Sequence, residues 1–342
     1  MLHARGLTRT FRRGKEVVEA VKGIDFDVSK GELVAFLGPN GAGKSTTLRM
    51  LTSLLMPTAG TVEVAGWDVV KHPRQVRTRI GYIGQGNGAG HSYRVLDELH
   101  NQGRFYQLPA AEYRRRATDL IEALDLGGLE KRTVQSLSGG QRRRLDVAMG
   151  LMNHPSLLFL DEPTTGLDPQ SRANLWEHIS TMRKEFDMTL VLTTHYLDEA
   201  DQMAERVIII DHGQIIADAT PDTLKRDHAD DLITLSVESD AVSEAGIADA
   251  LRDVVGQLEV TVRDNNTALV QLSTDDGPQW LPRAIESLRV ASLPVVSADV
   301  KQASLDDVFL NLTGRSLRED AAAGIGQDGG TSAATASEGA AA

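Results

Sequence analysis

The 342-residue chain contains no cysteine, so no disulfide framework can hold it together. This absence suits a reducing compartment. Long apolar runs are missing too, because no uninterrupted apolar stretch reaches the roughly 18 residues that suggest a membrane-spanning helix. The first residues, MLHARGLTRTF, also lack the apolar centre of a signal peptide. We therefore expect a chain that does not itself span a bilayer.

Net positive charge is also absent, since the formal charge is −12 at pH 7. Tight, non-specific binding of nucleic acids depends on Lys and Arg displacing counterions from phosphates. No nucleic-acid partner is therefore expected. The compact basic run at residues 142–144 is interpreted as a solvated helix face.

A glycine-rich stretch, GPNGAGKST at residues 38–46, follows an apolar run of strand length at residues 33–37. It fits the phosphate-binding pattern Gly-x4-Gly-Lys-Ser and is favoured over an ordinary glycine-rich turn by its strand context. Its backbone N–H groups and the following helix can surround a polyanion. The expected nucleotide-binding residues are Gly38, Pro39, Asn40, Gly41, Ala42, Gly43, Lys44, Ser45 and Thr46, with Lys44 neutralising the β- and γ-phosphates and Ser45 binding Mg²⁺.

An acidic pair, Asp161 and Glu162, ends the apolar run LLFL. Such a run is typical of a buried parallel strand, and ligands bind at the carboxyl ends of these strands. Asp161 is predicted to hold the metal and Glu162 to act as the general base. Positioning and charge compensation are most of what phosphoryl transfer requires. The alternative is a solvated acidic loop end.

The segment LSGGQ at residues 137–141 supplies a third anion-binding element, in which Ser138 offers a hydroxyl while Gly139 and Gly140 offer free N–H groups. A helix expected to begin at Gln141 would direct its positive end at the anion. A simple helix cap of small residues is the alternative. With the two preceding elements, LSGGQ makes the chain resemble the nucleotide-binding subunit of an ATP-binding cassette (ABC) transporter.

This resemblance implies a phosphate-loop ATPase of α/β class, with a mixed sheet core, an antiparallel β-subdomain and a helical subdomain at about residues 87–150. It also implies ATP and Mg²⁺ as cofactors and a second copy of the chain as partner. In this family, two subunits dock head to tail, and each LSGGQ segment covers the γ-phosphate bound by the other subunit.

Four further residues match the family one by one. Phe11 lies where an aromatic ring stacks on adenine, although a core phenylalanine is the alternative. Gln85 matches the glutamine that contacts Mg²⁺ and the attacking water, with a structural strand-end glutamine as the alternative. His195 matches the switch histidine at the γ-phosphate rather than a merely structural histidine. Asp168 matches the loop that communicates across the dimer, although TTGLDP lacks the Ser-Ala or Ser-Gly pair common in the family.

After Gln85 the chain reads GNGAGHSYR, which is richer in glycine than most family members. We expect a loop of low stiffness here. The family resemblance places this segment at the surface that receives the permease. His91, Tyr93 and Arg94 are therefore predicted to contact a separately encoded membrane permease.

The ATP-binding domain is predicted to occupy residues 1–225. Helical periodicity is expected between residues 97 and 126, and residues 211–213 read as a turn into a strand at residues 214–217. Other strands are expected at residues 17–21, 24–28, 33–37, 61–64, 157–160, 190–193 and 207–210.

A smaller α+β domain is predicted at residues 226–315. Alternating apolar residues indicate strands at 233–237, 258–262, 268–272 and 296–300, with helices at 242–255 and 280–288. The order βαββαβ suggests a ferredoxin-like module, with a turn at Asn265 and Asn266. Ser304 and Asp307 are predicted to cap a last helix in SLDDVFLNLTGR. The tail at residues 316–342, rich in Ala, Gly and Ser, is expected to be disordered.

The C-terminal segment resembles that of drug-resistance subunits of the daunorubicin and doxorubicin type. The resemblance implies an ATPase at the cytoplasmic face of the membrane that energises drug export through a separate permease. An importer, a lipid or polysaccharide exporter, or a non-transport ABC ATPase are the alternatives.

Overall fold

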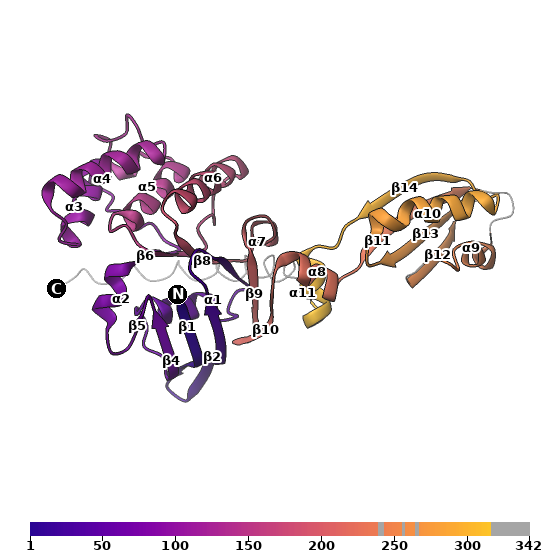
Figure 1. Cartoon of the computed structure of the whole chain (residues 1–342), viewed down its shortest axis with the longest axis horizontal. Coiled ribbons are helices and arrows are strands. Elements are labelled where there is room, and N and C mark those ends of the chain that lie inside the picture. Colours follow the sequence, from indigo (N-terminus) through magenta and orange to yellow (C-terminus); the bar gives the residue numbers. More distant parts are fainter. Residues whose placement is uncertain (239–242, 255–256, 264–266, 316–342) are drawn as a thin grey trace, which may run out of the picture. The chain divides into compact units, whose positions relative to one another are not determined.

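The computed structural model describes residues 1–238, 243–254, 257–263 and 267–315 (Figure 1). Contacts divide the chain into two compact units, Met1–Asp218 and a second that begins at Ala219. The turn expected at Asn265 and Asn266 and the expected disorder of residues 316–342 lie outside the described residues. The boundary predicted after residue 225 falls inside helix α8 (Pro221–His228), which belongs to the second unit.

A six-stranded sheet, ordered β10-β9-β3-β8-β7-β6, forms the centre of the first unit. Strand β3 pairs in parallel with β8 and β9, while β7 pairs in parallel with β6 and β8. Because parallel strands share their direction, β3, β7 and β8 end at one edge of the sheet. The strands are β3 (Leu33–Leu37), β6 (Ile80–Ile83), β7 (Leu157–Asp161), β8 (Thr189–Thr194), β9 (Arg206–Asp211) and β10 (Gln214–Ala219).

A second, four-stranded sheet of this unit has the order β2-β1-β4-β5. Two separate strands were expected at residues 17–21 and 24–28, but β2 (Glu16–Val28) is continuous. Register shifts in its pairing with β1 (Leu2–Arg13) place Val21 and Ile24, three residues apart, both in the core. This break in the alternation of β2 explains why two strands were predicted instead of one. Strand β1 was not predicted. The remaining strands are β4 (Ala59–Val64) and β5 (Trp67–Asp68).

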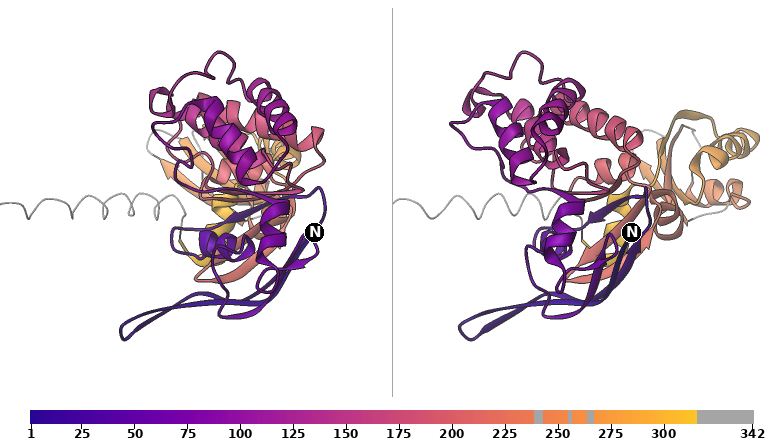
Figure 2. Two further views of the ribbon diagram at one scale, coloured as in Figure 1. Left: turned by 90° about the vertical axis from the view of Figure 1, so that its left-hand side faces the viewer. Right: turned by 60° about the vertical axis from the view of Figure 1, so that its left-hand side comes forward.

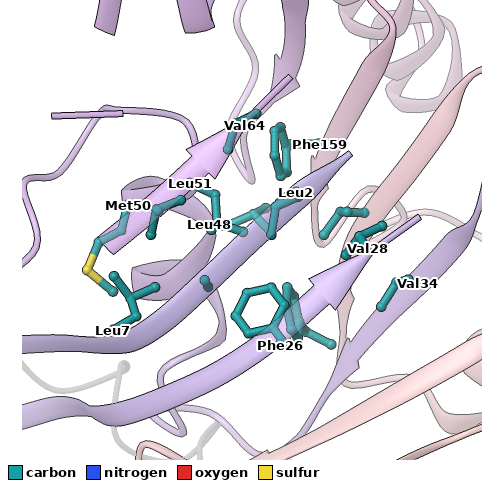
Figure 3. Packing of buried hydrophobic residues seen from close by; sticks show 14 of the residues in the cluster. Leu2, Leu7, Phe26, Val28, Val34, Leu48, Met50, Leu51, Val64 and Phe159 are labelled. Atoms are coloured by element: carbon teal, nitrogen blue, oxygen red, sulfur yellow. The ribbon is translucent and has the colours of Figure 1, made fainter. Parts of the chain in front are cut away.

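One apolar core joins the two sheets of the first unit (Figure 3). Leu2 of β1 and Phe26 of β2 share this cluster with Leu48 of helix α1 (Lys44–Leu51) and Phe159 of β7. The rings of Phe26 and Phe36 meet edge to face, with centroids 5.2 Å apart. The helix that follows the glycine-rich loop is therefore fixed by packing on the same strands that carry the predicted site.

A group of helices lies on the opposite side of the central sheet from the β1–β2 hairpin, as both views of Figure 2 show. It corresponds to the helical region expected near residues 87–150. No helix in the described part of the chain combines the length and the apolar character that crossing a membrane requires. The helices of the first unit after α1 are α2 (Pro73–Arg79), α3 (Val95–Phe105), α4 (Ala110–Ala123), α5 (Gly139–Leu151), α6 (Pro169–Glu185) and α7 (Leu197–Met203).

The second unit contains an antiparallel sheet ordered β12-β13-β11-β14. Ile233 and Leu235 of β11, with Val270 and Leu272 of β13, are buried as their alternation predicts. In β14 a register shift opposite Val237 places Val295 at the core and leaves Val296 62% exposed. The elements are β11 (Asp231–Glu238), α9 (Glu244–Ala250), β12 (Gln257–Arg263), β13 (Thr267–Thr274), α10 (Gly277–Val290), β14 (Val295–Lys301) and α11 (Leu305–Thr313).

Helix α11 begins with the capping arrangement predicted from the sequence. The Ser304 hydroxyl accepts the Asp307 N–H at 3.3 Å, and an Asp307 carboxylate oxygen accepts the Ser304 N–H at 3.0 Å. The helix packs against α8 and buries Phe309 completely, whereas the next residue, Leu310, is 43% exposed.

Replacing Phe309 by Ala is expected to lower the unfolding free energy of the α8–α11 pair by about 3–5 kcal/mol, because it empties a fully buried site. Leu310→Ala, on the same helix, should cost less than about 1 kcal/mol. Amide hydrogen exchange of peptides covering α8 would measure both changes. Equal protection of α8 in the two variants would contradict the assigned packing.

Candidate active site

The glycine-rich loop joins β3 to α1 and depends on two close backbone approaches. At Gly43, where φ is +110°, an added Cβ would lie 2.5 Å from the Ala20 carbonyl oxygen. At Gly38 it would lie 2.1 Å from the Ile210 carbonyl oxygen. Neither position can accept a side chain without a backbone shift. The loop therefore owes its shape to contacts from β2 and β9 as well as to its own sequence.

A cavity of about 220 Å³ lies against this loop. Lys44 is 4% exposed, and its ammonium group donates to the carbonyl oxygens of Gly38 at 2.6 Å and Pro39 at 2.9 Å. Burial lowers the pKa of Lys44, while the nearby Glu162 and Asp161 charges oppose that change. The residues that line the cavity are Asn40, Gly41, Gly43, Lys44, Ser45, Thr46, Gln85 and Glu162.

Asp161 ends β7 and is completely buried. One of its carboxylate oxygens accepts the Ser45 hydroxyl at 2.8 Å and the Thr193 hydroxyl at 2.7 Å. Hard oxygen ligands of this kind suit Mg²⁺, which retains several waters and substrate oxygens instead of needing a complete protein cage. The pairing of Ser45 with Asp161 therefore fits the predicted metal-binding role of both residues.

Glu162, the next residue, faces two other predicted catalytic side chains. Its Oε2 accepts a hydrogen bond from the side-chain amide of Gln85 at 2.9 Å and lies 3.4 Å from Nδ1 of His195, a distance that allows an ion pair when the imidazole is protonated. Burial opposes ionisation of Glu162, but His195, Lys44 and Thr165 outweigh it and hold the Glu162 pKa below its usual value. A lowered pKa favours the ionised carboxylate, the form that the predicted role of general base requires.

The backbone of Glu162 has the left-handed conformation, with φ at +47°. Its N–H donates to both the carbonyl oxygen and the hydroxyl of Thr193, at 3.1 and 3.0 Å. Thr193, which the sequence did not single out, therefore supports Asp161 and Glu162 together. An apolar strand ending in two threonines carries little sequence signal for such a role.

The remaining predicted site residues do not line this cavity in the single chain. Ser138 caps α5 reciprocally with Gln141, and Gly139 and Gly140 form the first turn of that helix. Asp168 caps α6 and accepts the N–H of Ser171 at 2.9 Å. Both segments thus cap helices and lie outside the cavity at the glycine-rich loop of their own chain.

Phe11 lies on β1 and is 38% exposed, so the core alternative for this residue is wrong. The guanidinium of Arg9 lies 4.5 Å from the centre of its ring. Phe11 does not line the cavity, and its stacking on adenine stays a prediction.

The sequence predicts a solvated helix face for the basic run at residues 142–144. This prediction is wrong. Arg143 is 6% exposed, and its guanidinium donates to the carbonyl oxygens of Gly84 at 2.8 Å and Pro163 at 2.6 Å. These carbonyls flank Gln85 and Glu162. One side chain of α5 therefore bridges the two segments that carry the predicted catalytic residues Gln85 and Glu162. This role depends on tertiary contacts and cannot be predicted from the sequence.

The glycine-rich segment after Gln85 is anchored more firmly than its composition suggested. Asp146 of α5 accepts the N–H groups of Gly88 and Ala89, at 2.9 and 3.3 Å. Glu98 of α3 accepts the N–H of Gly90 at 2.7 Å. Burial raises the pKa of both carboxyl groups, and these hydrogen bonds oppose that rise. Glycine allows the loop its shape, but buried carboxylates determine its position.

Comparison with known proteins gives relatives for nearly the whole chain. A family profile described as ABC transporter matches residues 21–165. The daunorubicin/doxorubicin resistance ATP-binding protein DrrA of Streptomyces peucetius is 43% identical over 86% of this chain and 88% of its own length. Nod factor export ATP-binding protein I of Ralstonia nicotianae is 37% identical over 93% of this chain and 95% of its own length.

Among solved structures, a dimeric post-hydrolysis state of the ATP-binding cassette MJ0796, bound to ADP and Pi, resembles this chain with a TM-score of 0.59 and 26% identity. The similarity covers 64% of this chain and 98% of that cassette. The profile, the relatives and this cassette agree with the phosphate loop, acidic pair and LSGGQ segment. The chain belongs to the family of ABC transporter ATP-binding proteins.

Proposed function

We propose that the chain hydrolyses ATP between two copies of itself, docked head to tail, to energise export through a separately encoded permease. The observation that carries this proposal is the separation of two anion-binding elements in one chain. Glu162, Gln85 and Lys44 line the cavity at the phosphate loop, while Ser138–Gln141 lie outside it. A second copy would supply the missing LSGGQ segment.

Each catalytic side chain then has a distinct part in the reaction. The glycine-rich loop and Lys44 bind the phosphates, and Mg²⁺, held by Ser45 and Asp161, would supply further charge compensation. Glu162 accepts the proton of the water that attacks the γ-phosphorus, and ADP departs as the leaving group. Gln85 and His195, both next to the Glu162 carboxylate, orient that water and the γ-phosphate.

Opening and closing of the pair follow from the shared γ-phosphate. ATP binds both the phosphate loop of one copy and the LSGGQ segment of the other, so it favours the closed dimer. Hydrolysis removes the group that both copies hold. The cassette MJ0796 is described as a dimer in a post-hydrolysis state bound to ADP and Pi, which supports a two-copy assembly for this fold.

Glu162→Gln is expected to lower kcat at least about 100-fold, because the amide cannot accept the proton from water. ATP binding is retained, so the variant should accumulate as an ATP-bound dimer. Light scattering after size-exclusion chromatography with ATP and Mg²⁺ would give the mass. Glu122→Gln, at an exposed position on α4, is the matched control. A Glu162→Gln sample that stays monomeric with saturating ATP would overturn the two-copy site.

The permease is proposed to contact the segment that follows Gln85. His91, Tyr93 and Arg94 are exposed at the end of this segment, and Tyr93 is 56% exposed. The hydrogen bonds to Asp146 and Glu98 hold the preceding backbone in place. Force on these exposed side chains can therefore reach Gln85 through a fixed loop. This arrangement would place the chain peripherally at the cytoplasmic face of the membrane.

Replacing His91, Tyr93 and Arg94 together by Ala should leave the ATPase activity of the isolated chain within about twofold, because none of them lines the catalytic cavity. Export by cells that carry the permease should fall at least tenfold. Retained drug, measured by fluorescence of accumulated daunorubicin, would report transport. Normal export by the triple variant would show that these three residues are not needed for the permease contact, and it would overturn this part of the proposal.

The cargo is proposed to be a hydrophobic drug or natural product. DrrA, at 43% identity, is named for daunorubicin and doxorubicin resistance. A second candidate cargo is a Nod factor, because an export protein for it is 37% identical to this chain. Transport assays with each compound, using the chain together with its permease, would distinguish the two.

A further inference from the structure

A buried carboxylate outside the catalytic cavity, that of Glu199, joins three segments of the site. Glu199 belongs to α7 and is 5% exposed. It accepts the hydroxyl of Thr164 through Oε1 and the hydroxyl of Thr194 through Oε2, the latter at 3.0 Å. Nε of Arg172 lies 3.5 Å from Oε1. Each of these three contacts comes from another element or loop.

Each of these partners borders a residue of the proposed mechanism. Thr164 follows Glu162 by two residues, and Thr194 immediately precedes His195. Arg172 lies in the first turn of α6, where its N–H donates to the carbonyl oxygen of the capping residue Asp168 at 3.0 Å. Glu199 thus connects the backbone after the general base, the switch strand and the helix of the Asp168 loop.

A second path links Arg172 to the switch histidine. The Arg172 guanidinium lies 4.0 Å from the centre of the Tyr196 ring, and that ring lies 4.2 Å from the ring of His195. The Tyr196 N–H donates to the Thr194 hydroxyl at 2.9 Å, which in turn donates to Glu199. The orientation of His195 is therefore coupled to Arg172 both by contacts through the Tyr196 ring and through Glu199.

We infer that Glu199 is a positioning residue, which holds His195 and the Glu162 backbone in register with the Asp168 loop. This inference rests on the proposed two-copy site, where the Asp168 loop would face the other copy. A change at that interface moves Arg172, and Glu199 transmits the change to His195. Hydrolysis would then require correct docking of the second copy as well as bound ATP.

Glu199→Gln keeps the size of the side chain but removes the charge that pairs with Arg172. We expect kcat to fall about 10- to 100-fold while KM for ATP stays within about twofold, because positioning errors act on the reacting geometry. The melting temperature should stay within about 4 °C of the parent protein. Asp198→Asn, the exposed neighbour on the same helix, is the matched control and should have normal kcat.

A double-mutant cycle with Arg172→Gln distinguishes the positioning role of Glu199 from a purely structural role. The Arg172 side chain is 27% exposed, so its replacement should disturb the fold less. If the two residues act as one unit, the double variant has nearly the kcat of the worse single variant. Multiplied losses, or a loss confined to melting temperature and KM, would overturn the positioning role. A Glu199→Gln protein with the kcat of the parent would do so as well.

Failure of this inference is distinguishable from failure of the two-copy site. The combined variant Glu162→Gln/Glu199→Gln should still form the ATP-bound dimer, since Glu199 acts on the hydrolytic geometry and not on ATP binding. Loss of the dimer only in the combined variant would assign Glu199 to assembly instead and overturn the inference. If the single variant Glu162→Gln already fails to form the ATP-bound dimer, the proposed function is refuted instead.

Discussion

The buried carboxylate of Asp161 is the contact on which the remainder of the site depends. It accepts hydrogen bonds from the hydroxyl groups of Ser45, in the phosphate-loop helix, and Thr193, in β8. It thereby connects segments that are far apart in the sequence. This meeting is possible only because β3, β7 and β8 run in parallel and end at one edge of the sheet. Glu162 and His195 lie at the same sheet edge, because each directly follows the last residue of one of these strands.

Much of this site could be predicted from the sequence, because its chemistry is carried by short contiguous segments. The phosphate loop, the acidic pair and LSGGQ each contain the residue types and the spacing that anion binding needs. Contacts that cross the fold gave no such signal. Arg143 had only charged neighbours to indicate exposure, yet its partners are main-chain carbonyls of two distant loops. Glu199 carries no sequence signal either, because its hydrogen-bond partner Thr164 lies 35 residues away in the sequence.

The fold was predictable where periodicity is regular. In the second unit, β11 and β13 alternate cleanly between buried and partly exposed residues, and both lie where the alternation predicted them. Register shifts defeated the same reasoning elsewhere. In β2 two buried positions fall three residues apart and suggest a break, whereas in β14 a shift turns Val296 toward solvent. Such shifts are set by pairing partners and cannot be derived from one strand alone.

The left-handed backbone of Glu162 has a consequence for mutational tolerance at this position. Residues branched at Cβ disfavour that conformation, while Gly, Asn and Asp adopt it more readily. A saturation scan would therefore mix two effects, a conformational penalty and the loss of the proposed proton acceptor. Glutamine shares the unbranched chain of glutamate and comes nearest to isolating the chemical effect, so a ranking of all variants at residue 162 by activity alone would confuse the two effects.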